Sequence, residues 1–291
     1  MPDNRSAFVL IALSMTLLAA GDATVRMLGE QLHVGQVIAL RGAVLIALLS
    51  IGLVVTGYRF QKKRLFHKWS ILRGLAETVS TYCFFFSLQF MPIAISTTVV
   101  FIFPIILTLV SIPLYGEQVG PWRWVAVIMG FLGVVLISNP SDGAFEWVLL
   151  LPVMTAIALV GRDLATRYIP KDIPAAEVTL TTAIITSFFG FLSFPFGWHT
   201  VEPFSIMLLP IAAALVALSF MTYIIAVRKG ELSIIAPAQY LVILWATFWG
   251  ALIWKEYPSN NAVYGGLLII SAGCLILWRE YVHQKKAGLP A

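Results

Sequence analysis

Long apolar segments alternate with short polar breaks along the whole chain. Each segment is about 20 residues long, the length at which an α-helix crosses the hydrocarbon core of a bilayer. Gly, Pro, Asn and Ser, which favour turns, occur in the breaks. The segments expected to span a membrane are residues 7–28, 34–57, 69–90, 92–115, 121–138, 145–166, 175–197, 205–227, 232–254 and 260–279. The pattern predicts an all-α integral membrane protein with ten transmembrane helices, the first of them retained rather than cleaved.

Composition supports this fold class and excludes several functions. Of the 291 residues, 59% are hydrophobic and 11% are charged, whereas a soluble domain carries about 25% charged residues. A soluble globular enzyme, a disordered chain and a disulfide scaffold are therefore excluded. The sequence has no metal-ligand spacing, catalytic triad or phosphate-binding loop. We expect no catalytic residue, no metal and no other cofactor, so the chain is not expected to be an enzyme.

The placement of positive charge predicts the orientation. Fourteen of the 19 Lys and Arg residues fall at one set of alternate loops and termini, and Lys255 alone falls at the other set. Lys and Arg accumulate on the cytoplasmic side of membrane proteins. We therefore expect both termini to be cytoplasmic. The net charge of +5 is explained by this topology, so nucleic acid is not an expected partner, and the lipid bilayer is.

The two halves of the chain resemble each other, which divides it into residues 1–140 and 141–291. The matching features are two glutamates at a shift of 139, Glu117 and Glu256, and two Asp-x-x-x-Arg segments at a shift of 141, residues 22–26 and 163–167. Each half has five predicted spans, and an odd number inserts the second half upside down. The sequence therefore predicts a 5+5 inverted repeat, an arrangement typical of secondary transporters.

Several motifs resemble the EamA family of the drug/metabolite transporter superfamily. The stretch from Pro92 to Glu117, the Gly-rich helix after it and their second-half echoes carry the resemblance over nearly the whole chain. Further features resemble the branch of S-adenosylmethionine and riboflavin carriers: Gly21-Asp22, Arg41, Leu72-Arg73-Gly74, Asp163 and the segment 236–240. The resemblance implies a carrier of the bacterial inner membrane that works by alternating access without ATP. It also implies a cavity between the first, third, fourth, sixth, eighth and ninth helices.

The resemblance also defines the expected function. We expect a secondary active transporter for a small polar or amphipathic metabolite, such as S-adenosylmethionine, riboflavin, an amino acid or a related zwitterion or cation, by uptake or exchange. A drug or amino-acid exporter of the same fold is the nearest alternative, and a non-transporting membrane subunit or receptor is an alternative of another class. Protons are a candidate coupling ion, and a monomer or a weak homodimer is expected.

Two pairs of charged residues lie near opposite ends of their spans. An ionisable group at the centre of a span costs about 2.5–3.5 kcal/mol, so such groups are functional candidates. Asp22 and Arg26 are four residues apart and lie on one helical face, as do Asp163 and Arg167. Each pair either closes a gate or anchors a helix end. Charge swaps at both sites that left transport intact would exclude the gating role.

Three further ionisable residues lie inside spans. Arg41 is expected either to pair with Asp22, which we favour, or to hold an anionic group of the substrate. Arg73 and Glu77 are four residues apart and are expected to pair. Glu77 could also tune substrate choice or carry a coupling proton.

Proline, amide and aromatic side chains complete the candidate site. Pro104 and Pro237 break helices and free backbone carbonyls. Gln239 and Tyr240 could bind a polar ligand edge and stack on a ring, or simply link helices. Mid-span aromatic residues include Tyr82, Phe101 and Trp245, which could line a cavity, although most such residues pack or face lipid. The Gly-rich helices 121–138 and 260–279 are expected to pack closely.

Overall fold

The computed structural model describes residues 4–55, 57, 62–103, 106, 110, 121–138, 147–170, 172–229, 239 and 241–286. Within these ranges the chain is helical and contains no β-strand. The α-helices are α1 (Asn4–Gly29), α2 (Val34–Val55), α3 (Lys62–Leu65), α4 (Lys68–Ser87), α5 (Ile93–Val100), α7 (Pro121–Ser138), α8 (Leu150–Arg167), α9 (Ala175–Phe191), α10 (Pro203–Lys229), α12 (Leu241–Trp254) and α13 (Asn260–Lys286). Two 3-10 turns, η2 (Trp147–Leu149) and η3 (Phe194–Phe196), join them.

Each predicted span contains a described helix. Four helical stretches are long and apolar enough to cross a membrane: Ser6–Gly29, Val34–Val55, Trp147–Thr166 and Pro203–Tyr223. Ala175–Phe191, Leu241–Trp254 and Asn260–Leu275 are shorter apolar helices. The prediction of an all-helical membrane protein is therefore confirmed.

The seventh predicted span was too long. The hydropathy pattern extended the seventh span to Gly197, whereas α9 ends at Phe191 and a 3-10 turn follows. Pro195 lies inside that turn and has no backbone N–H to donate to a continuing helix. Gly197 then adopts φ 89°, a left-handed conformation in which a residue with a Cβ atom is disfavoured.

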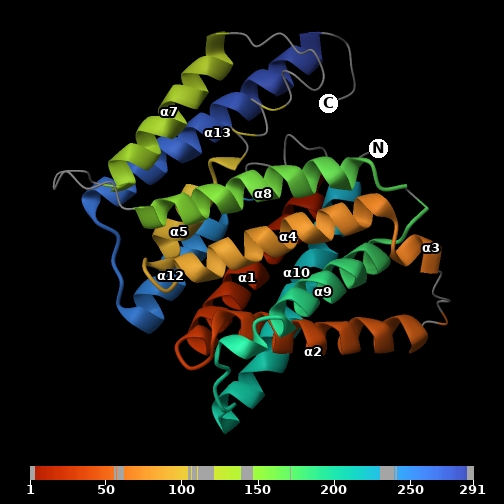
Figure 1. The fold of residues 1–291 in the computed structure, drawn as a ribbon. Helices are drawn as coiled ribbons and strands as arrows, with labels where there is room; N and C mark the ends of the chain where they lie inside the picture. Colours follow the sequence, from red (N-terminus) through yellow and green to blue (C-terminus); the bar gives the residue numbers. More distant parts are fainter. Residues whose placement is uncertain are drawn as a thin grey trace.

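The helices pack in four main pairs. Helix α1 packs along α10, α4 along α8, α2 along α9, and α7 along α13. Figure 1 shows the α7–α13 pair set apart from the other helices, whereas α8, α4 and α9 lie side by side across the front of the view.

Close approach within these pairs depends on small residues. A Cβ atom on Gly133 of α7 would lie 2.7 Å from the carbonyl oxygen of Gly265 in α13. A Cβ atom on Gly190 of α9 would lie 2.5 Å from the backbone nitrogen of Ala39 in α2. The prediction that the Gly-rich helices pack closely is therefore confirmed for α7 and α13.

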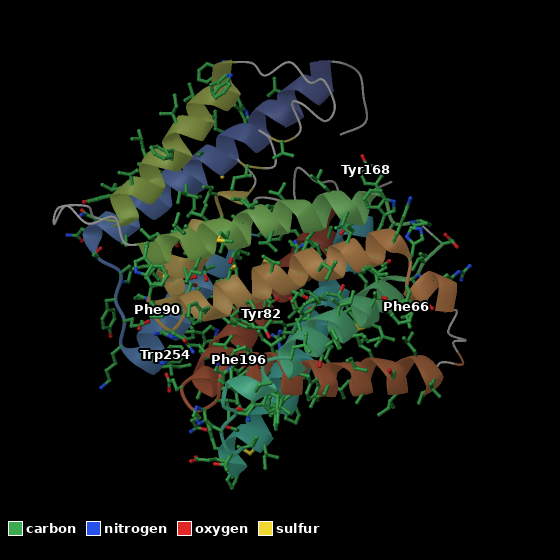
Figure 2. All side chains as sticks on the ribbon, in the orientation of Figure 1. Phe66, Tyr82, Phe90, Tyr168, Phe196 and Trp254 are labelled. Carbon is green, nitrogen blue, oxygen red and sulfur yellow. The ribbon has the colours of Figure 1, made fainter. Side chains whose placement is uncertain are left out.

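The outward faces of the helices are apolar. Phe90 and Phe196, both labelled in Figure 2, expose 52% and 76% of their surface. Phe131 of α7 and Leu244 of α12 are also exposed. Such extensive apolar surface is incompatible with an aqueous environment and fits a lipid-facing belt. Polar and charged chemistry is concentrated inside the bundle, where the candidate site lies.

Candidate functional site

A cavity of about 470 Å³ lies at the centre of the bundle. We call it the central cavity. Its walls come from α1, α4, α5, α8, α10 and α12, the six helices that the family resemblance implied, and also from α2 and α9. The charged residues among its described lining are Asp22, Arg41, Arg73, Glu77, Arg162 and Asp163. Five of these six residues were predicted from the sequence, and the sixth is Arg162. All six line the same cavity.

Arg162 of α8 joins two carboxylates on the cavity wall. Its Nη1 lies 3.2 Å from Oε2 of Glu77 in α4, and its Nη2 lies 2.8 Å from Oδ1 of Asp163. Its Nε also donates to Oδ1 of Asp163 at 2.9 Å. The side chains of Arg162 and Glu77 are only 17% and 13% exposed. Charge-assisted hydrogen bonds of this kind fix the spacing between α4 and α8.

The predicted pairing of Arg73 with Glu77 is therefore corrected. Arg73 donates instead to Oγ1 of Thr182 in α9, at 2.6 Å. Glu77 takes its ion pair from Arg162, because α4 and α8 pack along their lengths and bring the two side chains together. Sequence reasoning missed Arg162. Its position inside an apolar span was the signal that could have identified it.

A second charged cluster lies at one end of the bundle. Arg26 of α1 donates from Nη1 and Nη2 to the two carboxylate oxygens of Glu256, both at 2.6 Å. The Arg26 guanidinium also lies over the Trp254 ring, 4.2 Å from its centroid. Trp254 Nε1 donates to Glu30. We call Arg26, Glu30, Trp254 and Glu256 the latch, and this end of the molecule the latch end.

The latch corrects the predicted pairing of Asp22 with Arg26. These residues share a helical face, but Asp22 lines the central cavity while Arg26 reaches past the end of α12 to Glu256. Lys255 has φ 55°, and this unusual left-handed residue turns the chain sharply after Trp254. The Glu256 N–H then donates to the carbonyl of Gly250 at 3.1 Å. This turn aims the carboxylate at Arg26.

The predicted pairing of Asp163 with Arg167 stays a prediction. Asp163 accepts hydrogen bonds from Arg162, and the side chain of Arg167 lies outside the described residues. At this end the described ion pair is Arg64–Asp172, which is 3.1 Å long and largely exposed. The central cavity reaches this end through Ile169, Pro170 and Ile173, so we call it the loop end.

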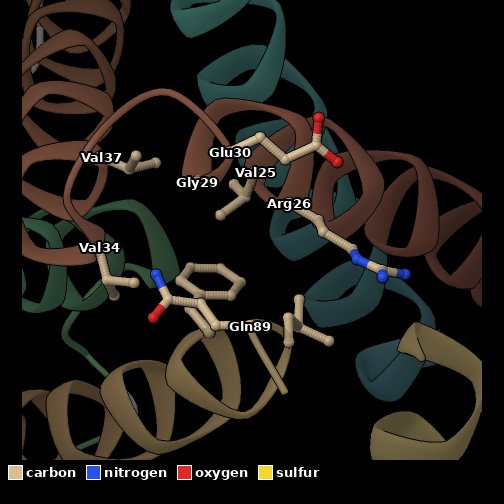
Figure 3. Close-up of a pocket in the computed structure, with 9 residues that line it drawn as sticks. Val25, Arg26, Gly29, Glu30, Val34, Val37 and Gln89 are labelled. Carbon is tan, nitrogen blue, oxygen red and sulfur yellow. The ribbon is translucent and has the colours of Figure 1, made fainter. Parts of the chain in front are cut away.

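A smaller pocket of about 310 Å³ lies beneath the latch. Figure 3 shows Arg26 on the right of it, Val34 and Val37 of α2 on the left, and Glu30 and Gln89 between them. Phe85 of α4 is the single described residue that lines both this small pocket and the central cavity. The two spaces are therefore separated at the Phe85 side chain.

Arg41 lies on the central-cavity side of that partition. Its guanidinium lies over the Phe85 ring, 5.1 Å from the centroid, and the residue is 9% exposed. Its Nε is buried and has no hydrogen-bond partner among the described residues. No ion pair within 4.0 Å joins Arg41 to Asp22 or to another described residue, so the favoured pairing with Asp22 is not formed in this structure.

The remaining candidates divide between the cavity and the packing. Phe101 and Gln239 line the cavity, and Gln239 Nε2 donates to Tyr223 Oη at 3.3 Å. Tyr82 is not among the described lining residues, and its hydroxyl donates to the Phe189 carbonyl at 3.0 Å. Trp245 packs against an apolar core cluster. Three further candidates lie outside the described residues: Pro104, Pro237 and Tyr240.

The profile of one known family matches two ranges of this chain. The EamA-like transporter family profile matches residues 5–139 and again residues 146–278. The chain belongs to the EamA-like transporter family. This EamA-like protein therefore repeats the family unit in each half, with one match ending and the next beginning between α7 and α8.

Its relatives are transporters with different names. The S-adenosylmethionine uptake transporter of Rickettsia bellii is 24% identical over 216 residues, which cover 74% of each chain. The riboflavin transporter of Rhizobium johnstonii is 26% identical over 172 residues, 59% of this chain and 57% of that one. The pseudopaline exporter of Pseudomonas aeruginosa is 20% identical over 282 residues, 94% of this chain and 96% of that one.

A solved crystal structure has the same fold. It superposes with a TM-score of 0.54, covers 94% of this chain and 96% of its own, and is 19% identical. At this identity the likeness supports the fold alone. Together with the family matches and the apolar helices, it makes the EamA-like protein an integral membrane protein whose relatives transport small metabolites rather than catalyse reactions.

Proposed function

We propose that this protein is a secondary transporter that moves a small polar or amphipathic metabolite across the bacterial inner membrane by alternating access. The observation that carries the proposal is a charged cavity enclosed by helices of both halves, bounded by Phe85 towards the latch end and reaching the loop end. A carrier needs such a site because its cargo must be reached from one side of the membrane at a time.

The proposed framework is a 5+5 inverted repeat of residues 1–140 and 141–291. If each helix of the first half corresponds to one of the second in order, α1 corresponds to α8 and α4 to α10. The α1–α10 pair then maps onto the α8–α4 pair, while α2–α9 and α7–α13 map onto themselves. Packing that maps onto itself is what a two-fold axis between the halves requires, and the two family matches support the same division.

The proposed orientation places the loop end in the cytoplasm, together with both termini. This end carries α3 and Arg64, and the sequence places most Lys and Arg residues in the same set of loops. The positive-inside rule then assigns the latch end to the outside. In this orientation the structure corresponds to a cytoplasm-facing state in which the latch closes the outer entrance.

Some relatives favour uptake or exchange as the direction of transport, and another favours export. The S-adenosylmethionine and riboflavin relatives favour uptake or exchange, whereas the pseudopaline exporter matches over more of the chain. We favour uptake or exchange, because the relatives of this kind are the more similar by identity. Protons remain a candidate coupling ion, and a monomer or weak homodimer remains the expected assembly.

Counterflow in liposomes tests the proposal. Purified protein is reconstituted into vesicles preloaded with unlabelled S-adenosylmethionine, riboflavin or an amino-acid mixture, and entry of the labelled compound is measured. We expect saturable accumulation for one chemical class, retained in Arg64→Gln and lost in Arg162→Gln. Folded protein that gives no saturable flux with any member of the panel would favour a non-transporting membrane subunit or receptor.

A further inference from the structure

The ionisable groups of the central cavity fall into two sets. Towards the loop end, Arg162 is bonded to Glu77 and Asp163, and Arg73 is bonded to Thr182. The two positive charges of these arginines balance the two negative charges of Glu77 and Asp163. Nearer the latch end, Arg41 and Asp22 remain, and neither has a hydrogen bond or ion pair with a described residue. The cavity therefore contains one charged set joined by bonds and a second set that forms no hydrogen bond or ion pair among the described residues.

The Arg41 guanidinium presents N–H groups that can bind an anion. Phe85 covers one face of the guanidinium, which leaves its N–H edge for an acceptor, and the Nε on that edge is buried without one. A buried cation without a partner is costly, and more so within a membrane. The planar fork of arginine matches the two oxygens of a carboxylate better than any other acceptor except phosphate. A carboxylate is therefore a group that Arg41 can hold with two parallel hydrogen bonds.

Asp22 supplies the complementary charge. It lines the same cavity from α1, and its carboxylate is within electrostatic range of Arg41 without touching it. A separated anion and cation that line one cavity match a ligand whose two opposite charges are also separated by a short distance. An α-amino carboxylate carries its ammonium and carboxylate on one carbon atom and presents both in this way.

We propose that Asp22 and Arg41 form the recognition site for the zwitterionic end of the cargo, with Arg41 holding an α-carboxylate and Asp22 an α-ammonium. The inference rests on the proposed transport function and narrows the cargo to amino acids or metabolites that end in a free amino-acid group. The remaining volume of the 470 Å³ cavity, lined by Phe84, Phe101 and Phe103, accepts the apolar or aromatic remainder.

Matched ligand series test this assignment by thermal shift and counterflow. One series is phenylalanine, 2-phenylethylamine and 3-phenylpropanoate. A second is S-adenosylhomocysteine, its decarboxylated form and 5′-methylthioadenosine, and riboflavin is included as a ligand without an amino-acid group. We expect a zwitterion of at least one series to bind, and its partners that lack one or both charges to bind about tenfold to hundredfold more weakly, because a charge-assisted hydrogen bond is lost.

Two variants assign the two charges separately. Arg41→Gln should remove the preference for the zwitterion over the amine but leave the amine's own affinity within threefold. Asp22→Asn should remove the preference for the zwitterion over the carboxylate analogue but leave the affinity for that analogue within threefold. Arg64→Gln and Asp172→Asn make the same substitutions in an ion pair outside the cavity and should change neither preference. Native-like melting of each variant shows that folding is retained.

The outcomes separate this inference from the proposed function. Saturable binding and flux of riboflavin or of an amine alone, with no preference for zwitterions, would leave the transporter proposal standing and overturn the assignment. Zwitterion selectivity that survives in Arg41→Gln and Asp22→Asn would overturn it as well. Absence of binding and flux across the whole panel would overturn both proposals.

Discussion

The latch predicts how strongly one end of the bundle is held closed. Both Arg26–Glu256 contacts are 2.6 Å long, and the two side chains are 12% and 26% exposed. A hydrogen bond to a charged partner contributes about 1.5–3 kcal/mol, and the partial exposure places this pair near the lower limit. Glu256→Gln keeps one acceptor and loses the charge, so we expect it to remove about 1.4 kcal/mol. If the latch exists only in the state closed at this end, that loss shifts the closed-to-open ratio about tenfold.

Thiol labelling measures this shift. Val37 lines the small pocket beneath the latch and is 1% exposed. In a background with Cys83→Ser and Cys274→Ser, Val37→Cys should react slowly with a maleimide reagent. Adding Glu256→Gln should raise the labelling rate about tenfold, because the open state is populated more often. Asp172→Asn, which breaks an exposed ion pair at the other end, should change the rate less than twofold.

A charge exchange decides whether the pair itself is responsible. Arg26→Glu alone places two carboxylates together and should label faster than Glu256→Gln. Arg26→Glu combined with Glu256→Arg should restore much of the slow rate, since the pair is rebuilt in reverse. Labelling within twofold of the parent in Glu256→Gln, in protein that melts normally, would refute the reasoning that the latch controls closure.

Three further predictions concern folding and the cavity. Arg162→Gln leaves two partly buried carboxylates, Glu77 and Asp163, without their shared cation. We expect a destabilisation of about 3 kcal/mol, the lower end for breaking a buried pair, measured by thermal melting, and only partial recovery in Arg162→Lys. Gly133→Leu places a side chain against the Gly265 backbone and should lower Tm by several degrees, whereas Phe131→Leu on the exposed face of the same helix should not. Glu177 is fully buried, and neither of its carboxylate oxygens bonds to a residue of the described ranges. Glu177→Gln should therefore raise Tm by a few degrees, and an unchanged or lower Tm would contradict this explanation.

The helices could be predicted from sequence because a span is recognised from local hydropathy alone. The same holds for the close contact at Gly133, since a residue without a side chain inside an apolar helix indicates a neighbouring backbone. These features depend on local composition and spacing. Their prediction needs no knowledge of which helices are neighbours.

Ion-pair partners could not be predicted in this way. A spacing of four residues places Asp22 near Arg26. The Arg26 guanidinium instead binds Glu256, which lies 230 positions further along the chain. Likewise Glu77 bonds to Arg162 across 85 positions rather than to its helical neighbour. Charged side chains are long enough to reach several partners, so packing between helices decides among them. The residues of the site were largely identifiable, whereas their pairing required the three-dimensional arrangement.

The thin partition at Phe85 has an electrical consequence. If water fills the small pocket on one side and the central cavity on the other, most of the membrane voltage falls across this one ring. Moving an elementary charge through that voltage changes its free energy by about 2.3 kcal/mol per 100 mV. A cargo of zero net charge passes the Phe85 partition without a change in its free energy from the membrane voltage. Transport of a zwitterion would then be electrically silent, whereas any accompanying proton would generate a current.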